Sequence, residues 1–193
     1  MASGLSLQTW GMELTRTPVA SLEMLFDPHL EARIRAEWQA LAAAGYSSLA
    51  AHPSPTNRPH LTLVARPSMP PIDRAALDSV ITLPIAVTIG DPVLFGAGDR
   101  RVLARFVVPT TELFELHAAL HTVLGRDEAD APHTRVGEWT PHITLARRIR
   151  RDDLPEALRL LDTADRGGSG DRGEGTTLRH WDPATATVTH ILG

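Results

Sequence analysis

The sequence predicts an α+β fold with antiparallel sheets, and three observations support that class. Runs typical of strands and of amphipathic helices are mixed along the chain, without the regular alternation of a doubly wound sheet. A five-residue pattern in the first half returns in the second half, as expected for a duplicated unit. The chain has 193 residues, 42% of them hydrophobic, which suits one domain or two small lobes that share a core.

After a polar start at residues 1–17, which we expect to be a flexible extension, residues 19–26 form the first predicted strand. Asp27 and Pro28 then supply an N-cap and a proline at the first helical position. They predict a helix over residues 28–44 that ends at Gly45. The apolar residues of this helix repeat at helical spacing and form one buried stripe, made of Leu30, Ile34, Trp38 and Leu41.

The next segment is proline-rich and extended, and it leads into a predicted strand over residues 60–64. A short helix is expected over residues 73–80. Residues 83–89 and 102–108 are strand-like, and we expect them to pair as an antiparallel hairpin across a loop at residues 90–99. That loop contains several glycines but lacks a Gly-Lys-Ser/Thr ending, so it is not predicted to bind nucleotide phosphates.

In the second half, Thr110 is predicted to cap a long helix that runs to Leu124 and stops at Gly125. A strand over residues 142–146 and a helix over residues 153–164 follow. Residues 166–175 are rich in glycine and predict a flexible loop. The chain closes with two strand-like runs, residues 177–181 and 185–192, around an Asp-Pro turn.

The composition excludes several kinds of chemistry. Cysteine is absent, so disulfides, thiolate nucleophiles and cysteine-ligated metal centres are excluded. All 19 basic residues are arginine, which excludes a phosphate-loop lysine, a Schiff base and an adenylylated lysine. A net charge of −4 argues against nucleic-acid binding by bulk electrostatics. The absence of cysteine fits the cytoplasm best. Because no apolar run approaches the length of a membrane span, we expect a soluble protein that is not secreted.

The repeated pattern is the pentapeptide Pro59-His60-Leu61-Thr62-Leu63, which returns as Pro141-His142-Ile143-Thr144-Leu145. In a strand, residues i and i+2 share a face and lie about 6.6 Å apart, so each histidine lies beside its threonine. The aliphatic side chains between them point to the opposite face, into apolar packing. If a pseudo-twofold axis relates the two halves, the two polar faces can meet across a cleft around one small ligand.

Two imidazoles and two hydroxyls around one cleft suit a phosphodiester. An imidazole is a base when neutral and an acid when charged, so a pair can perform both proton transfers near neutral pH without a metal. The hydroxyls of Thr62 and Thr144 can donate to the non-bridging oxygens, where charge develops. The alternative is that His60 and His142 are half-buried strand residues bonded to backbone, with the threonines present for their β-propensity. The recurrence of the pattern favours the catalytic interpretation.

A pair of His-x-Thr motifs about 80 residues apart in a chain of this length resembles the 2H phosphoesterase superfamily, in particular its bacterial 2'-5' RNA ligase-like branch. The resemblance extends over residues 19–192. It implies one bilobal domain over residues 1–193, in which two antiparallel sheets with flanking helices are related by a pseudo-twofold axis around a central cleft. By position, His60 and His142 match the family's catalytic histidines, and Thr62 and Thr144 match its phosphate-binding hydroxyls.

The resemblance also implies a reaction without a metal or other cofactor. One imidazole activates water for attack on the 2',3'-cyclic phosphate of an RNA end or a nucleotide, and the other protonates the departing ribose oxygen, which leaves a 2'-phosphate. Which histidine is the base stays open. Ligation into a 2'-5' linkage is the same chemistry with an RNA hydroxyl in place of water, and hydrolysis is favoured because water is always available. The alternative from another class is an RNA-end or nucleotide-binding module with little turnover, and in either case we expect a monomer.

Weaker signals concern contacts with RNA or phosphate, for which the candidates are Arg58, Arg147, Arg148, Trp139 and Tyr46. The arginines flank the motifs, where they can bind phosphate or simply belong to solvated turns. The aromatic rings can stack on a nucleobase or belong to the core and its rim.

His117 and His121 lie at i and i+4 of the second long helix, a spacing that can bind zinc. Their segment lacks the glutamate of the metalloprotease motif. We therefore expect exposed or capping histidines and propose no metal.

Overall fold

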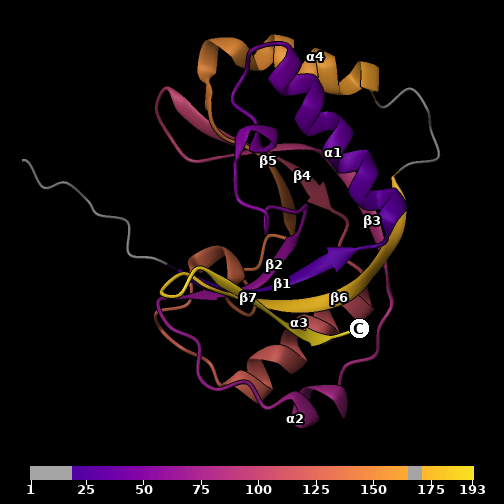
Figure 1. Ribbon diagram of the computed structural model, residues 1–193, viewed down its shortest axis with the longest axis vertical. Helices are drawn as coiled ribbons and strands as arrows, with labels where there is room; N and C mark the ends of the chain where they lie inside the picture. Colours follow the sequence, from indigo (N-terminus) through magenta and orange to yellow (C-terminus); the bar gives the residue numbers. More distant parts are fainter. Residues whose placement is uncertain (1–18, 165–170) are drawn as a thin grey trace, which may run out of the picture.

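The structure is a computed structural model that describes residues 19–164 and 171–193 (Figure 1). The expected extension at residues 1–17 lies outside the described residues. The strands are β1 (Ala20–Phe26), β2 (Leu61–Arg66), β3 (Ile85–Phe95), β4 (Arg100–Val107), β5 (His142–Arg150), β6 (Arg172–Asp182) and β7 (Thr187–Leu192). The helices are α1 (Pro28–Ala43), α2 (Arg74–Asp78), α3 (Thr111–Leu124) and α4 (Leu154–Ala164), with 3₁₀ turns η1 (Leu49–Ala51), η2 (Pro132–Thr134) and η3 (Arg151–Asp153).

All strand pairs are antiparallel, which confirms the predicted α+β class. The strands follow the path β2-β1-β6-β3-β4-β5, and β7 pairs with β6 off this path. Residues 85–88 of β3 pair with β6, whereas its later residues pair with β4. The two sheets expected from the resemblance are therefore joined into one seven-stranded path, because a single long strand runs from one half into the other.

The predicted hairpin of β3 and β4 is present, but its strands are longer than expected. Residues 90–95, predicted as loop, continue β3, and Pro92 to Phe95 pair with β4. A register shift between Ile89 and Pro92 lets the strand pass a glycine and a proline that normally interrupt pairing. The turn itself is confined to residues 96–99, where Gly96 and Gly98 have φ values of 87° and 77°.

The glycine-rich segment, expected as a flexible loop over residues 166–175, is partly a strand, because β6 begins at Arg172. Residues 165–170 lie outside the described residues. A Cβ atom on Gly173 would collide with the Leu30 side chain, and one on Gly175 would collide with Met24. Glycine is therefore required for the close approach of β6 to β1 and α1, and its presence here does not indicate flexibility.

The long helices begin as the sequence predicts. The Asp27 carboxylate accepts the N–H groups of His29 and Leu30 at 2.8 and 3.0 Å, and Pro28 occupies the first position of α1. The Thr110 hydroxyl accepts the Leu113 N–H at 3.2 Å and so caps α3. Side-chain oxygens thus satisfy donors that have no partner within the helix.

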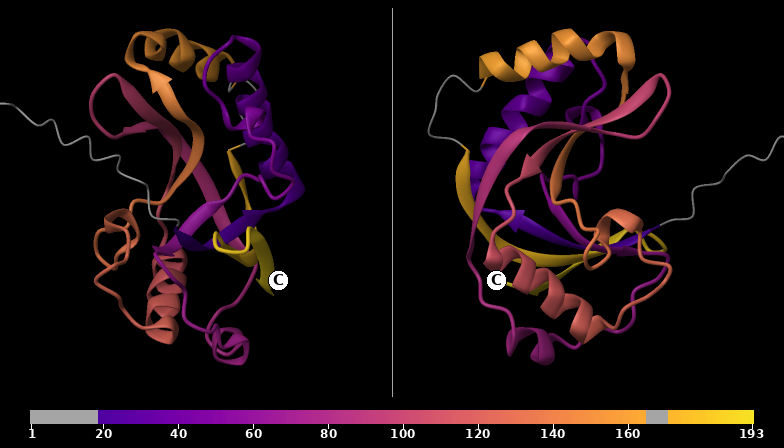
Figure 2. Two further views of the ribbon diagram at one scale, coloured as in Figure 1. Left: turned by 60° about the vertical axis from the view of Figure 1, so that its left-hand side comes forward. Right: turned by 180° about the vertical axis from the view of Figure 1, so that it is seen from behind.

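The helices cover the sheet in two groups (Figure 2). α1 packs against α4 and contacts β5, whereas α3 contacts β2 and α2. The predicted stripe of α1 is buried, since Trp38 is only 2% exposed and its three aliphatic members are fully covered. The sheet is curved, so that β2 and β5, the two ends of the strand path, contact each other. No helix among the described residues has the length and apolar character that a membrane crossing requires.

Candidate active site

A cleft of about 480 Å³ lies over one face of the β2–β1–β6 part of the sheet. Glu23 of β1 pairs in register with Thr62 of β2 and with Arg179 of β6, so these three residues form one row of the cleft floor. His133 of η2 and Arg147 of β5 also line the cleft. Residues from both halves of the chain therefore surround one cavity.

The first motif has the predicted alternation. His60 and Thr62 line the cleft, whereas Leu61 and Leu63 are completely buried on the other side. The Nδ1 atom of His60 lies 2.7 Å from the carbonyl oxygen of Arg58. A carbonyl only accepts, so Nδ1 carries a hydrogen and the lone pair of the neutral ring is on Nε2. Nε2 is thus the nitrogen that remains for a ligand.

The second motif repeats this anchor, because Nδ1 of His142 lies 2.7 Å from the carbonyl oxygen of Thr140. The ring of His142 packs against Phe95 with centroids 4.5 Å apart, and lies 5.7 Å from the ring of His133. Burial lowers the pKa of His142, and electrostatic repulsion from His133 and His60 lowers it further, against the hydrogen bond to Thr140. His142 is therefore neutral at pH 7, with the lone pair of Nε2 able to accept a proton.

Two tryptophans connect each motif to the opposite half of the molecule. Nε1 of Trp38 in α1 donates to the carbonyl of Thr144 at 3.0 Å, and Nε1 of Trp139 donates to the carbonyl of Thr62 at 3.1 Å. β2 and β5 end the strand path, so neither has a further strand on its outer side. The indoles satisfy carbonyl groups that would otherwise be buried without a partner.

Thr62 and Thr144 are half-buried. Within residues 19–164 and 171–193, neither threonine hydroxyl has a hydrogen-bond partner. Both are therefore able to donate to a bound oxyanion.

Glu23 is the one carboxylate among the described residues that line the cleft. It is 5% exposed, and it accepts hydrogen bonds from Ser21 Oγ at 2.7 Å and Arg179 Nε at 2.8 Å. Burial by itself raises the pKa of Glu23, but the attraction of His60 and Arg179 and these hydrogen bonds outweigh it, and the pKa lies below its usual range. Glu23 is therefore ionised at neutral pH.

Arg147 reaches the cleft because β5 is irregular. Between Thr144 and Ala146 the register against β4 shifts, and β5 contains one extra residue. Such a bulge reverses the alternation of side chains, and Arg147 lines the cleft. His142 and Thr144 of the same strand are not among the residues that line it. Arg148 is exposed and does not line the cavity, and its carbonyl accepts from Arg100 at 3.4 Å.

Three other candidates lie away from the cleft lining. The guanidinium of Arg58 forms an ion pair with Glu31 of α1. Tyr46 is half-buried against the hydrophobic core. Trp139 is 8% exposed, and its ring stacks on that of His117 with centroids 4.2 Å apart and an interplanar angle of 6°. That neighbour covers a face of the indole that a nucleobase would need.

His117 and His121 differ from the expectation of exposed or capping residues, because each is only 2% exposed. Nε2 of both rings lies within hydrogen-bond distance of the Thr134 carbonyl, at 3.0 and 2.9 Å, so both carry their hydrogen on Nε2. Burial, together with repulsion from His121, lowers the pKa of His117 to about 4. The pair packs as neutral rings under η2 and holds the turn that carries His133.

Several cleft residues escaped the sequence analysis: Ser21, Glu23, His133, Arg179 and Trp181. A signal was present for most of them. Ser21 and Glu23 are polar residues at i and i+2 of an otherwise apolar strand, and Arg179 and Trp181 have the same spacing in β6. Polar side chains on one face of a buried strand are unusual unless they are paired or functional.

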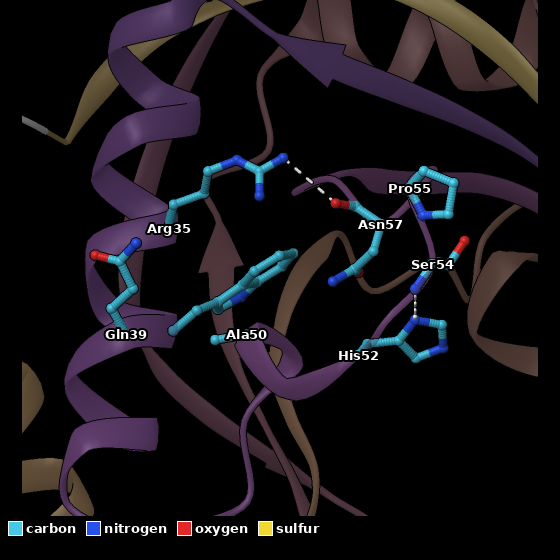
Figure 3. A pocket seen from close by; sticks show the side chains of 8 residues that line it. Arg35, Gln39, Ala50, His52, Ser54, Pro55 and Asn57 are labelled. Carbon is cyan, nitrogen blue, oxygen red and sulfur yellow. Dashed lines mark hydrogen bonds between the residues drawn. The ribbon is translucent and has the colours of Figure 1, made fainter.

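A second cavity of about 310 Å³ lies beside the cleft, between α1 and the segment after η1 (Figure 3). Arg35 and Gln39 of α1 line it together with His52, Ser54 and Asn57, and the last three also line the cleft. Arg35 donates to the Asn57 carbonyl at 3.3 Å, and the Ser54 N–H donates to Nδ1 of His52 at the same distance. Residues 52–57, the segment between the two cavities, therefore contribute polar groups to the lining of both.

Comparison with known proteins identifies the class and then the family. Among solved structures, Usb1 of Kluyveromyces marxianus is similar, with a TM-score of 0.54 and 11% identity over 92% of this chain and 99% of that one. The same protein with uridine monophosphate has a TM-score of 0.50 and 11% identity over 91% and 98% of the two chains. At this identity the similarity establishes the fold. No curated protein matches the sequence significantly.

A sequence-family model described as the 2'-5' RNA ligase superfamily matches residues 26–192. The class predicted from the two pentapeptides, the 2H phosphoesterases, is thereby confirmed. The chain belongs to the 2'-5' RNA ligase superfamily.

Proposed function

We propose that this protein is a metal-independent phosphodiesterase that opens the 2',3'-cyclic phosphate of an RNA end and leaves a 2'-phosphate. The observation that carries the proposal is the identical anchoring of His60 and His142. Each imidazole donates from Nδ1 to the carbonyl two residues before it, and each therefore offers Nε2 for proton transfer. Family membership supports an enzyme of this general kind.

The proposed reaction is an in-line displacement at phosphorus. One imidazole accepts a proton from water as the water oxygen bonds to phosphorus, and the other gives its proton to the ribose 3'-oxygen as that P–O bond breaks. His142 is suited to accept the proton, because its lowered pKa keeps the ring neutral. After turnover the two rings exchange protons with solvent and return to their starting states. Each transfer contributes about 10²- to 10⁴-fold in rate.

Polar residues of the cleft and of the second motif suit the phosphate. The free hydroxyls of Thr62 and Thr144 can donate to the non-bridging oxygens, and Arg147 supplies positive charge from the cleft wall. Such donors stabilise the charge that develops on these oxygens in the transition state.

An aromatic residue on the cleft floor supports a nucleotide substrate. Trp181 of β6 is partly exposed in the cleft and pairs with Ser21, one row beyond Glu23. It lies two strands and about two residues from Thr62, which corresponds to about 12 Å. That separation allows a base to stack on the indole while its phosphate lies at the motifs. The similar Usb1 structure with uridine monophosphate is consistent with such a ligand.

The test is hydrolysis of an oligoribonucleotide that ends in a 2',3'-cyclic phosphate, with and without EDTA, and with the product compared against 2'- and 3'-phosphate standards. We expect 2'-phosphate in both conditions. His29→Ala, a change at an exposed histidine on α1, is the matched control for His60→Ala and His142→Ala. Tight binding without product in wild type would favour the RNA-end-binding module and contradict the proposal.

The same incubation with an oligonucleotide that carries a free 5'-hydroxyl measures the ligase direction. In that reaction the RNA hydroxyl replaces water as the nucleophile, and a 2'-5' linkage forms through the same two proton transfers. Because water is in large excess, we expect hydrolysis to dominate.

A further inference from the structure

The floor of the cleft contains a negative charge where a phosphate is proposed to bind. Glu23 is ionised, and it is the one carboxylate among the described cleft-lining residues. A fixed anion repels an anionic substrate, so its presence requires a function that outweighs this repulsion.

The carboxylate of Glu23 is held rigidly. Its Oε2 accepts from Nε of Arg179 at 2.8 Å, and the second Arg179 contact, from the Nη2 atom, is also 2.8 Å long. Arg179 is itself fixed, because Nη1 donates to the carbonyl of Thr56 at 3.0 Å. Ser21 Oγ donates to Oε1 at 2.7 Å.

Oε1 of Glu23 lies 3.7 Å from Nε2 of His60. This separation is longer than a hydrogen bond, so a hydrogen on Nε2 stays free to be donated elsewhere. Since Nδ1 already carries a hydrogen for the Arg58 carbonyl, a second proton on the ring must be on Nε2, directly beside the carboxylate. The contact therefore stabilises the charged ring at the atom that would deliver the proton.

We propose that Glu23 is a positioning residue that keeps His60 in its charged form, which makes His60 the proton donor to the leaving oxygen and His142 the proton acceptor. The inference rests on the proposed function and adds the residue that sets the direction of proton transfer. Arg179 and Ser21 keep the Glu23 carboxylate ionised and oriented toward His60. The summed charge of Glu23, Arg179 and protonated His60 is positive, so together they attract the phosphate.

The surroundings of the two histidines differ in the way this division requires. The ionisable groups that line the cleft with His60 are Glu23, His52, His133, Arg147 and Arg179, and only Glu23 is negative. His142 also interacts electrostatically with His60. His142 forms no ion pair with a carboxylate in the described part of the chain, and it lies against Phe95 and His133. Burial lowers the pKa of His142, which supports the role of acceptor.

The experiment compares two leaving groups in the full chain. One substrate is an oligoribonucleotide 2',3'-cyclic phosphate. The other is the same cyclic ester with sulfur in place of the 3'-oxygen, from which a thiolate leaves without needing a proton because the pKa of a thiol is about 8.5. In Glu23→Gln we expect turnover at pH 7 to fall by about 10- to 100-fold on the oxygen ester, and to stay within about threefold of wild type on the sulfur ester. The alkaline limb of the pH profile should move to lower pH, because a donor must be charged to act.

Two variants serve as controls. His142→Ala removes the acceptor, and we expect a loss on both esters. Glu37→Gln removes a fully buried carboxylate that pairs with Arg105 at 2.5 Å, away from the cleft lining, and any effect of losing such a pair should be equal on both esters. Equal losses for Glu23→Gln on the two esters would show that Glu23 acts only through stability and would overturn the inference.

A readout without turnover separates this inference from the proposed function. The ring carbon signals of His60 can be followed by ¹H–¹³C NMR as the pH is raised in wild type and in Glu23→Gln. We expect the charged form to persist to higher pH in wild type. If both proteins titrate alike, the inference fails even when the enzyme is active. If wild type turns over neither ester while the titrations differ, the proposed function fails and the stabilising contact of Glu23 remains.

Discussion

The two motif strands share a backbone design and differ in their electrostatics. On β2 and on β5, Nδ1 of the histidine lies 2.7 Å from the carbonyl two residues earlier, and an indole donates to the carbonyl of the threonine. His60, however, lies 3.7 Å from a carboxylate, whereas His142 lies against an aromatic ring and a second histidine. The geometry is the same at both histidines, whereas the groups around their Nε2 atoms differ.

The largest expected effect is the loss of either imidazole. His60→Ala and His142→Ala should each lower kcat on a cyclic phosphate by about 10²- to 10⁴-fold, since each removes one of two proton transfers. Circular dichroism and thermal unfolding should show that both variants fold. Full activity in either variant would show that this histidine does not take part in proton transfer, and the two histidines could then not be compared as acid and base.

The threonines test whether the two halves contact the same phosphate. Thr62→Val and Thr144→Val should each lower kcat by about 10²-fold, because each removes one donor to the developing oxyanion. Thr→Ser at the same positions retains the hydroxyl and should restore most of the rate. A loss in only one valine variant would show that the hydroxyls are as unequal as the imidazoles.

The paired indoles should affect stability. Trp38→Phe and Trp139→Phe each leave a threonine carbonyl without its donor, at a cost of about 1–3 kcal/mol in the free energy of unfolding. Urea unfolding measures both. Tyr46→Phe, at a partly buried aromatic residue of the core rim, is the control and should change stability little. A similar loss of stability in the two tryptophan variants would show that the two indole hydrogen bonds contribute equally to the free energy of unfolding.

The acid limb of the pH profile should report His142. A base must be neutral to act, so the rate falls as pH falls through the pKa of His142, which burial and nearby positive charge place below 6.5. We therefore expect the midpoint of this limb below pH 6.5. His133→Gln removes one ring that repels a proton on His142 and should move the midpoint upward by a fraction of a unit. A midpoint above 6.5 would contradict the assignment of His142 as base.

The smallest effect concerns the arginines after the second motif. Arg147 lines the cleft and Arg148 does not, although they are neighbours in the sequence. Arg147→Gln should raise KM for an oligonucleotide by up to about fivefold and reduce its dependence on salt. Arg148→Gln should leave KM nearly unchanged. Equal effects would show that the bulge in β5 does not select between them.

Much of this architecture is predictable from the sequence because its signals are local. The caps at Asp27 and Thr110, the helical stripe of α1 and the alternation within each pentapeptide all involve residues a few positions apart. The glycines of β6 misled the prediction, because their reason is a distant one: Gly173 and Gly175 lie where Leu30 and Met24 leave no room for a Cβ atom.

The site was predictable only in part, for the same reason. His60, His142 and their threonines are marked by recurrence. Glu23 and Arg179 meet through the pairing of β1 with β6, a register that no local pattern specifies. Trp139 was a reasonable candidate for base stacking until the fold placed His117 against its ring. The sequence shows which chemical groups a residue carries, but the tertiary fold determines which other residue contacts those groups.

The crossed indoles of Trp38 and Trp139 imply that the two halves form one cooperative unit. Each motif strand takes a hydrogen bond from a residue that belongs to the other repeat. A fragment that ends after β4 contains His60 and Thr62 but lacks the donor to the Thr62 carbonyl, and the complementary fragment lacks Trp38. Neither half of the chain therefore contains all the hydrogen bonds that hold its own motif strand.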